Sequence, residues 1–388
     1  MNTQNRLILS LGTNQGDKKV NLTKAIDLIH KGVGTVISIS SLYEFPAWGF
    51  ESEPFFNCAI LVHTLLSPQQ VITNTLAIEK ELGRIRTQET GYAARIIDID
   101  ILAYNEDTVK EDNLTIPHPL MQERRFVLQP LADLHLDWVH PVLKKNIAQL
   151  LRDCPDETTF QHVGTLASTL ENHPLKRLNF VAIEGNIGAG KTTLTHRIAE
   201  DFNAKSIFEG FADNPFLPKF YQDASRYAFP LEMSFLADRY AQLSDDLAQF
   251  DLFKEFIIAD YYIFKSLIFA QITLEEDEFR LYQQVFDIMY KETPKPDLYV
   301  FLYQNTDRLL ENIHKRGRSY ESDISGQYLD QVTKGYFNFM KTLPTEKVLL
   351  IDISDLDFVA NQADYIYILD QIEEKLGKVD SIQFTVHG

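Results

Sequence analysis

The segment Val181–Leu194, "VAIEGNIGAGKTTL", constrains the fold of this chain more than any other stretch. An apolar run leads into a glycine-rich loop, and the residues after the loop suit a helix. Gly185 and Gly190, followed by Lys191 and Thr192, fit the spacing of a phosphate-binding loop. Glycines allow the backbone to approach the phosphates, and the loop N–H groups point at the anion. We therefore predict nucleotide contacts from Gly185, Asn186, Ile187, Gly188, Ala189, Gly190, Lys191 and Thr192, with Lys191 on the β- and γ-phosphates and Thr192 helping to bind Mg²⁺.

The position of this loop indicates two domains. A phosphate-binding loop usually follows the first strand of its domain, and here a long segment precedes Val181. The length of 388 residues also suits two cores better than one. The stretch 152–178 interrupts the apolar periodicity and contains Pro155, Gly164 and Pro174, which favours a connection. We expect a first domain at 1–155, a linker at 156–177 and a second domain at 178–388.

Charge and composition exclude several classes of protein. The net charge is −18, with 15 Lys+Arg against 21 Asp+Glu through Pro174 and 22 against 34 after it, so neither half has the basic balance of a nucleic-acid binder. The start at Met1–Arg6 lacks an apolar signal segment, and no apolar run approaches the roughly 18 residues of a membrane span. Cys58 and Cys154 are the only cysteines and lack metal-ligand spacing. We expect a cytoplasmic protein that binds neither nucleic acid nor a membrane.

In the second half, short apolar runs alternate with segments of helical length. The candidate strands are Phe180–Glu184, Ser206–Glu209, Phe256–Asp260, Leu298–Tyr303 and Val348–Asp352. This alternation predicts an α/β domain with a doubly wound parallel sheet. Ligands of such sheets bind beyond the carboxyl ends of the strands, so Lys191, Glu209 and Asp260 should converge on one crevice.

The first half reads as an α+β sheet with helices on its faces. Strands are predicted at 6–14, 35–45, 55–64 and 94–104, and helices at 17–31 and 68–85. The period of two places Asp98 and Asp100 on one strand face, with Ile97, Ile99 and Ile101 on the other. Paired carboxylates suit Mg²⁺, which commonly bridges to substrate phosphates. The arginines just upstream can neutralise a polyphosphate; they are Arg84, Arg86 and Arg95.

Further motifs of the second half appear in a specific order: "SIFEGFADNPFLPKFYQD", "RYAFPLEMSFLADRYAQL", "IADYY" and "HKRGRSYE". With them, residues 179–376 resemble the deoxyribonucleoside kinases of the deoxyadenosine, deoxyguanosine and deoxycytidine kinase family. The resemblance implies ATP-dependent 5′-phosphorylation of a deoxynucleoside, and a homodimer formed through the helices. It also implies roles for single residues: Glu209 near the substrate 5′-OH, Tyr221 and Glu321 at the 3′-OH, Glu232 and Arg239 at the base, and Arg316 and Arg318 over the ATP phosphates.

Two departures from this family bear on mechanism and specificity. The family commonly has an acidic-Arg-Ser triplet where this chain has Asp260-Tyr261-Tyr262, so the proton acceptor is either Glu209 or Asp260, and the added aromatic area suits a purine. Glu232 stands where Gln is frequent. An ionised Glu only accepts hydrogen bonds, which disfavours thymine. Arg239, two helical turns on, is expected to keep Glu232 ionised. We predict a purine deoxynucleoside, with deoxyadenosine first.

The first half carries "LSLGTN", "YEFPAWGF", "PFFNCAI", an R-x₂-D-x-D segment and "PHP…ERRF". Residues 6–151 thereby resemble 6-hydroxymethyl-7,8-dihydropterin pyrophosphokinase. The resemblance implies a ferredoxin-like fold and transfer of the β,γ-diphosphate of ATP to the hydroxymethyl group of hydroxymethyldihydropterin. It implies that Asp98 and Asp100 hold two Mg²⁺ ions. ATP would contact Arg84, Arg86, Arg95, His118 and Arg124, while Phe55 and Phe126 stack on the pterin and Asn57 binds its edge. The chain departs from the family with Ala93-Ala94 in place of Gly-Pro and with Phe55 in place of Tyr.

Two alternatives compete with a bifunctional enzyme of folate synthesis and nucleoside salvage. The second half could be a nucleoside monophosphate kinase, which needs basic residues around an acceptor phosphate; Glu209, Tyr221 and Glu232 favour a neutral nucleoside. One half could instead be an inactive nucleotide-binding scaffold, against which both complete phosphate-handling sets argue. Nothing in the sequence indicates channelling between the halves.

Overall fold

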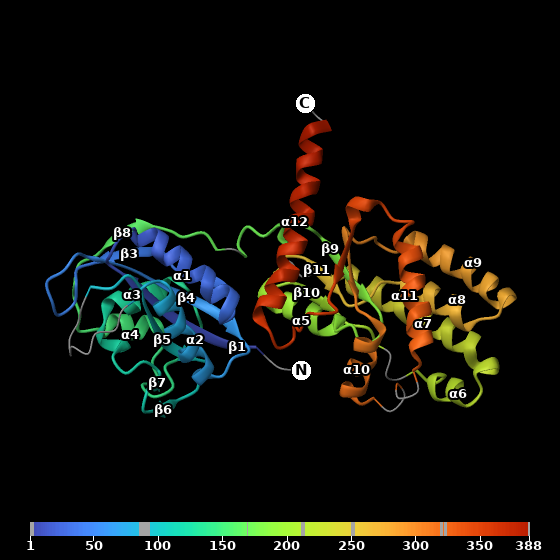
Figure 1. The fold of residues 1–388 in the computed structure, drawn as a ribbon, viewed down its shortest axis with the longest axis horizontal. Coiled ribbons are helices and arrows are strands. Elements are labelled where there is room, and N and C mark those ends of the chain that lie inside the picture. Colours follow the sequence, from blue (N-terminus) through green and yellow to red (C-terminus); the bar gives the residue numbers. More distant parts are fainter. Residues whose placement is uncertain are drawn as a thin grey trace. The chain divides into compact units, whose positions relative to one another are not determined.

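The computed structural model describes residues 4–84, 94–168, 170–210, 214–249, 253–318, 321 and 324–386. The chain divides into two compact units, Met1–His173 and Pro174–Gly388, each with its own sheet and core (Figure 1). Within the described residues, no helix is long and apolar enough to cross a membrane.

The first unit is built on an antiparallel sheet. Its strands are β1 (Asn5–Thr13), β2 (Thr35–Ile39), β3 (Leu42–Phe45), β4 (Phe55–Thr64), β5 (Asp98–Tyr104) and β8 (Gln161–Gly164). They run in the order β5-β1-β4-β3-β8, and β2 also pairs with β4. A separate hairpin joins β6 (Val109–Glu111) and β7 (Leu114–Ile116).

Helices cover both faces of this sheet. Alternate residues of β1 and β4 pack with α1 (Lys18–Gly32) and α2 (Pro68–Glu81) in one core cluster. The intervening residues pack with α3 (Arg125–Asp133) and α4 (Ile147–Arg152) in another, next to the short η1 (Met121–Glu123). Caps in the sequence set the helix starts: the Asp17 side chain accepts from Val20 N, and Ser67 forms a capping box with Gln70.

Two parts of the first unit differ from the sequence-based expectation. The strand predicted over 35–45 is two strands, because the Ser40 hydroxyl accepts from Ala59 N and interrupts the run between β2 and β3. The predicted linker 156–177 contains β8, which pairs with β3 and so extends the sheet of the first unit, and η2 (Pro174–Arg177). The domain limits given from the sequence stay a proposal.

The second unit is an α/β domain with a parallel sheet, as predicted. Its strands are β9 (Phe180–Gly185), β10 (Lys205–Ile207), β11 (Ile257–Ala259), β12 (Leu298–Tyr303) and β13 (Val348–Asp352), in the order β10-β11-β9-β12-β13. Every pairing is parallel. All residues of β9 are buried, as expected for a central strand covered on both faces.

The helices of the second unit are α5 (Lys191–Asp201), α6 (Leu217–Gln222), α7 (Ala224–Ala248), α8 (Phe264–Thr273), α9 (Glu276–Glu292), α10 (Thr306–Arg316), α11 (Gly326–Met340) and α12 (Gln362–Val386), with a short η4 (Thr345–Lys347). Helices α7, α8, α9 and α11 pack together, and α8 contacts each of the other three (Figure 1). Their shared core is rich in aromatic side chains, and it includes Tyr261 and Tyr262 directly after β11.

Candidate active sites

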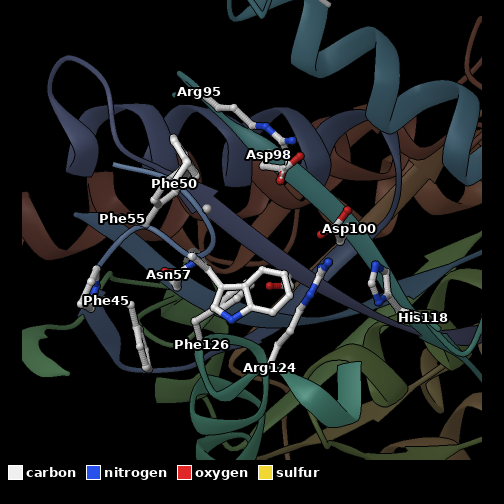
Figure 2. Close-up of a pocket in the computed structure, with 14 residues that line it drawn as sticks. Phe45, Phe50, Phe55, Asn57, Arg95, Asp98, Asp100, His118, Arg124 and Phe126 are labelled. Carbon is white, nitrogen blue, oxygen red and sulfur yellow. Dashed lines mark hydrogen bonds and ion pairs between the residues drawn. The ribbon is translucent and has the colours of Figure 1, made fainter. Parts of the chain in front are cut away.

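A cavity of about 240 Å³ lies in the first unit, at one end of the central strands. Its floor comes from β1, β4 and β5, and its walls come from the loop before β4 and from residues around α3 (Figure 2). The lining residues are Ser10, Gly12, Phe45, Pro46, Trp48, Phe50, Phe55, Asn57, Arg95, Asp98, Asp100, His118, Arg124 and Phe126.

Strand register brings the polar floor residues together. Gly12 of β1 pairs with Asn57 on one side and Asp98 on the other, and Ser10 pairs with Asp100. A Cβ at Gly12 would come within 2.9 Å of Asn57 Nδ2, so glycine keeps this floor open. The two carboxylates share the cavity face while Ile99 lies in the opposite core, which confirms the predicted alternation along β5.

Arginines surround the two carboxylates. Arg84 Nη1 lies 2.5 Å from Asp98 Oδ1, and Arg95 pairs with the other oxygen of Asp98. Arg84 also pairs with Glu79, a buried carboxylate of α2 that also accepts from Ile99 N. Burial, followed by the charge of Asp98, raises the pKa of Asp100 to about 7. Asp98 is thus paired with two arginines, and the charged form of buried Asp100 requires a nearby cation.

The donor set fits Mg²⁺ better than a metal held by protein alone. Among the described residues, no group of three or more His, Cys, Asp or Glu side chains could hold a metal ion. Mg²⁺ is commonly bound by one or two carboxylates, with the remaining oxygens from substrate phosphates and water. Asp98 and Asp100 supply that pair of carboxylates.

His118 and Arg124 are further polar residues that line the cavity. Burial, and then the charge of Arg124, lower the pKa of His118 to about 4, so its imidazole is neutral near pH 7. His118 Nδ1 accepts from Leu120 N at 3.2 Å, which leaves the proton on Nε2 as a donor. Arg124 lies 5.2 Å from the Trp48 ring centroid and 5.7 Å from that of Phe126, and its side chain points toward Asp100 in Figure 2.

The other side of the cavity is aromatic. Phe55 and Phe126 are half-buried and line the cavity. Phe50 lies beside Phe55 with ring centroids 6.2 Å apart, and Trp48 lies 6.4 Å from Phe126. Within the described part of the unit, buried Asn57 Oδ1 has no hydrogen-bond partner. A flat ligand with N–H donors on its edge would satisfy this oxygen between the rings.

Sequence reasoning missed several members of this site. Trp48 and Phe50 stand in the motif "YEFPAWGF", and its density of aromatic residues was the available signal. Glu79 carries no local signal, because its pairing with Arg84 is recognisable only in the fold. Arg86 lies in 85–93, outside the described residues.

In the second unit, the phosphate-binding loop joins β9 to α5. Gly190 caps α5 in the left-handed region at φ 78°, and a Cβ there would lie 2.7 Å from Phe358 Cζ. Lys191 Nζ donates to Asn186 O at 2.8 Å. Burial, and then the charge of Lys265, lower the pKa of Lys191 to about 8. The loop is thus closed by its own lysine, at the amino end of a helix.

The predicted convergence at the carboxyl edge of the sheet is confirmed. Asp260 Oδ2 accepts from the Thr192 hydroxyl at 2.5 Å, and Asp260 Oδ1 accepts from Glu209 N at 2.8 Å. The charge of Lys191 also acts on Glu209. The phosphate loop and the ends of β10 and β11 therefore meet in one polar cluster.

Glu209 is held by two cations. Its Oε1 accepts from Arg239 Nε at 2.9 Å and Nη2 at 2.8 Å, and its Oε2 lies 2.6 Å from Lys265 Nζ. Burial alone would raise the pKa of Glu209, but the charges of Lys265 and Arg239 bring it well below its usual range. Lys265 was missed from the sequence, where it is a single lysine in an apolar helix. Lys265 supplies a cation close to Asp260-Tyr261-Tyr262, the triplet in which this chain lacks the arginine common in the family.

The expectation that Arg239 keeps Glu232 ionised is wrong. Arg239 instead donates hydrogen bonds to Glu209 and, at 2.7 Å, to Ser266 Oγ. Glu232 Oε1 instead accepts from the Thr273 hydroxyl at 2.9 Å. Burial raises the pKa of Glu232 to about 7 against the opposing charge of Arg239. Near neutral pH the side chain is therefore a mixture of carboxylate and carboxylic acid.

The aromatic argument for a purine is also wrong. Tyr261 and Tyr262 are fully buried in the core cluster of the unit. The Tyr261 hydroxyl donates to Gln242 Oε1 at 3.0 Å, and that of Tyr262 donates to Pro294 O at 3.1 Å. Both rings are committed to packing because the chain turns into α8 directly after β11.

The arginines predicted to cover ATP lie together at the end of α10. Arg316 Nε lies 3.1 Å from Glu321 Oε2, and Arg318 Nη1 lies 3.4 Å from Glu321 Oε1. More than a third of each arginine side chain is exposed, whereas that of Glu321 is buried. The side chain of Tyr221, the other residue assigned to the sugar, lies outside the described residues.

Comparisons with known proteins agree with this division. Residues 181–377 match the family model of deoxynucleoside kinases, and residues 8–136 match that of 7,8-dihydro-6-hydroxymethylpterin-pyrophosphokinases. The chain is 38% identical to deoxyguanosine kinase of Bacillus subtilis over 199 residues, which cover 50% of this chain and 96% of that protein. It is 28% identical to deoxyadenosine kinase of Lactobacillus acidophilus over 219 residues, which cover 53% and 100%.

The first unit has its own relatives. It is 42% identical to 2-amino-4-hydroxy-6-hydroxymethyldihydropteridine pyrophosphokinase of Porphyromonas gingivalis over 136 residues, which cover 34% of this chain and 92% of that protein. The chain is therefore a bifunctional kinase that belongs to the 7,8-dihydro-6-hydroxymethylpterin-pyrophosphokinase family through residues 8–136 and to the deoxynucleoside kinase family through residues 181–377.

Proposed function

We propose that the first unit transfers the β,γ-diphosphate of ATP to 6-hydroxymethyl-7,8-dihydropterin and that the second phosphorylates the 5′-hydroxyl of a purine deoxynucleoside. The observation that carries the first activity is the unpartnered Asn57 Oδ1, placed between aromatic rings and beside paired carboxylates. The second is carried by the contact between Asp260 and Thr192 at the phosphate loop. Each site would use Mg–ATP.

In the first unit, Asp98 and Asp100 would hold Mg²⁺, which neutralises phosphate charge and aligns the diphosphate for attack. Arg84, Arg95 and Arg124 would bind phosphate oxygens of ATP. The Nε2–H of neutral His118 would donate to ATP. The pterin would lie between Phe55 and Phe126, with its N–H edge on Asn57. The succession β1-α1-β2-β3-β4-α2-β5 corresponds to βαββαβ when β2 and β3, which both pair with β4, count as one interrupted strand. With the β5-β1-β4-β3 order, it supports a ferredoxin-like fold.

In the second unit, Lys191 and the loop N–H groups would bind the phosphates of ATP, and Arg316 and Arg318 would close over them. Thr192 and Asp260 would hold Mg²⁺, since their contact lies where the loop meets the end of β11. That assignment leaves Glu209 to accept the hydroxyl proton. Because a loose transition state does not require a strong base, a well-placed carboxylate can accept the hydroxyl proton even though its pKa is lowered.

The protonation of Glu232 bears on the choice of base. As a carboxylate it accepts twice, which matches N1–H and the N2 amine of guanine. As an acid it donates once and accepts once, which matches N1 and the N6 amine of adenine. The named relatives, a deoxyguanosine kinase and a deoxyadenosine kinase, support purines in general. We place deoxyadenosine first and deoxyguanosine second, with Tyr221 and Glu321 at the 3′-hydroxyl.

A nucleoside acceptor fits better than a monophosphate. An acceptor phosphate needs available cations, and the two buried cations next to Glu209 are both paired with it. The test is ATP consumption by the purified full chain with the pterin, the four deoxynucleosides and the four deoxynucleoside monophosphates, with mass spectrometry of each product. Phosphorylation of monophosphates but not of nucleosides would overturn the proposal for the second unit.

A homodimer through the second unit remains part of this proposal. Leu281 and Ile288 are exposed by 51% and 68% on α9, and their spacing of two helical turns puts them on one side of the helix. Light scattering after gel filtration should give twice the mass of 44.7 kDa. A monomeric mass that persists at high concentration would remove the dimer.

A further inference from the structure

We propose that Lys265 is a positioning residue of the phosphoryl-transfer site, whose ammonium holds the Glu209 carboxylate in the orientation that a substrate hydroxyl requires. This inference rests on the proposed deoxynucleoside kinase activity of the second unit and assigns a task to a residue that no sequence motif indicated.

The location of Lys265 calls for a functional partner. It is the second residue of α8, where its neighbours Ser266, Ile268 and Ala270 are buried. Its own side chain is only 10% exposed, and that of Glu209 only 11%. Burying an ammonium is costly unless a counter-charge and hydrogen bonds compensate. The contact of 2.6 Å with Glu209 Oε2 supplies that compensation.

The two cations on Glu209 are not equivalent. Arg239 approaches Oε1 with two nitrogens and is itself fixed by Ser266 Oγ, so it anchors one side of the carboxylate rigidly. Lys265 reaches Oε2 on a flexible stem with three donors and leaves that oxygen a second lone pair. A substrate hydroxyl can share Oε2 with Lys265, which would keep the carboxylate from turning away.

Lys265 also balances the charge of the whole cluster. The groups facing it are the carboxyl groups of Glu184, Glu209 and Glu232 and the ammonium of Lys191, with which it interacts electrostatically; Asp260 and Arg239 complete the set. Burial pushes the pKa of Glu209 upward, and among the opposing influences the charge of Lys265 comes first. Without Lys265, Glu209 Oε2 would lose the charged donor that holds it in place.

The experiment compares the full-length wild type with Lys265→Met and Lys265→Arg, measuring kcat and KM for ATP with deoxyadenosine and with deoxyguanosine as the acceptor. Lys265→Met should lower kcat roughly 100-fold, since misplacing a reacting group costs about that much. KM for ATP should stay within about threefold, because Lys265 acts through Glu209 and not on the nucleotide. Lys265→Arg should recover most of the rate, because its guanidinium can also donate to Glu209 Oε2.

Two further proteins separate positioning from packing. In a Glu209→Gln background, Lys265→Met should cause little additional loss, since its target is already gone. Lys254→Met is the matched control, because the Lys254 ammonium donates to Asn203 Oδ1 in an exposed contact. It should behave as wild type.

The possible failures can be told apart. A wild type that phosphorylates no deoxynucleoside overturns the proposed function, and the role of Lys265 with it. An active wild type with an unaffected Lys265→Met overturns the inference alone. Equal losses in Lys265→Met and Lys265→Arg, together with a full additional loss from Lys265→Met in the Glu209→Gln background, would show a packing role, which also overturns it.

Discussion

The carboxylate of Asp260 accepts a hydrogen bond from the hydroxyl of Thr192 across 2.5 Å. This contact joins the end of β11 to the first turn of α5, 68 residues earlier in the chain. It distinguishes Asp260 from Glu209, because the Asp260 carboxylate contacts the phosphate loop while the Glu209 carboxylate contacts Arg239 and Lys265.

We therefore predict different responses of the two acids to magnesium. Asp260→Asn should lower kcat for the deoxynucleoside and raise the Mg²⁺ concentration needed for half-maximal rate, because the metal loses a charged neighbour. Glu209→Gln should lower kcat by roughly 10²-fold with an unchanged Mg²⁺ requirement. Initial rates over a Mg²⁺ titration test this. Asp277→Asn, at a side chain that is 95% exposed, is the control. If Glu209→Gln shifts the Mg²⁺ curve and Asp260→Asn does not, the roles are reversed.

The two activities should separate by mutation, since each unit has its own phosphate-handling residues. Lys191→Ala should lower nucleoside phosphorylation by roughly 10²-fold or more and leave pterin diphosphorylation nearly unchanged. Asp98→Ala should do the reverse. Both assays are run on the same preparations, with circular dichroism as a check of folding. Loss of both activities in either folded variant would contradict independent sites.

Metal binding in the first unit can be probed without removing shape. Asp98→Asn keeps the size of the side chain but loses the charge that opposes Mg²⁺. We expect the rate of pterin diphosphorylation to fall at every Mg²⁺ concentration, while binding of ATP alone, measured by calorimetry, weakens much less. An unchanged rate throughout the titration would exclude a metal role for Asp98.

Asn57 should matter for the pterin and little for the fold. Asn57→Ala removes an amide whose buried oxygen has no hydrogen-bond partner among the described residues, so the relief of that oxygen offsets lost packing. We expect KM for the pterin to rise about 10-fold, the worth of about one hydrogen bond, with less than about 1 kcal/mol change in unfolding free energy.

Asn105→Ala provides the matched comparison. The Asn105 side chain accepts from Arg6 N and donates to Asn5 Oδ1, so its amide is fully engaged in the fold. Its loss should destabilise the unit and leave KM for the pterin unchanged. Equal KM values in Asn57→Ala and the wild type would remove Asn57 from the pterin site.

Much of the fold could be predicted because the strongest periodic segments dominate it. The runs 6–14 and 55–64 alternate clearly and became β1 and β4, and the helices with side-chain caps, α1 and α2, lie where expected. β8 was missed because four residues of polar composition acquire strand geometry only by pairing with β3. α3 was missed because Pro130 lies within it, and a proline inside a segment argues against a helix. The helix forms because its apolar residues pack in the core of the first unit.

The site was predictable where one segment carries several functional residues, and less so where partners are distant. The phosphate loop and the Asp98/Asp100 pair are local patterns. Lys265 lies 56 residues from Glu209 in the sequence, and Arg239 lies 30 residues from it, so no helical or strand periodicity could predict either contact. The wrong expectation that Arg239 keeps Glu232 ionised has the same origin. Helical spacing predicted that Arg239 lies near Glu232, but the Arg239 guanidinium pairs with Glu209, which lies outside that helix.

The last prediction concerns Glu232 and the pH dependence of base choice. Burial raises the pKa of Glu232 to about 7, so the acid dominates below that pH and the carboxylate above it. The acid pairs with adenine and the carboxylate with guanine. Raising the pH from 6 to 8 should therefore raise kcat/KM for deoxyguanosine relative to deoxyadenosine, by up to about 10-fold if one hydrogen bond changes partner. Glu232→Gln cannot titrate, so its ratio should stay flat across this range, and Glu278→Gln on the first turn of α9 should titrate as the wild type does. Kinetics with the four deoxynucleosides at each pH test this. A wild-type preference for thymidine, or a ratio that changes equally in Glu232→Gln, would show that another group selects the base.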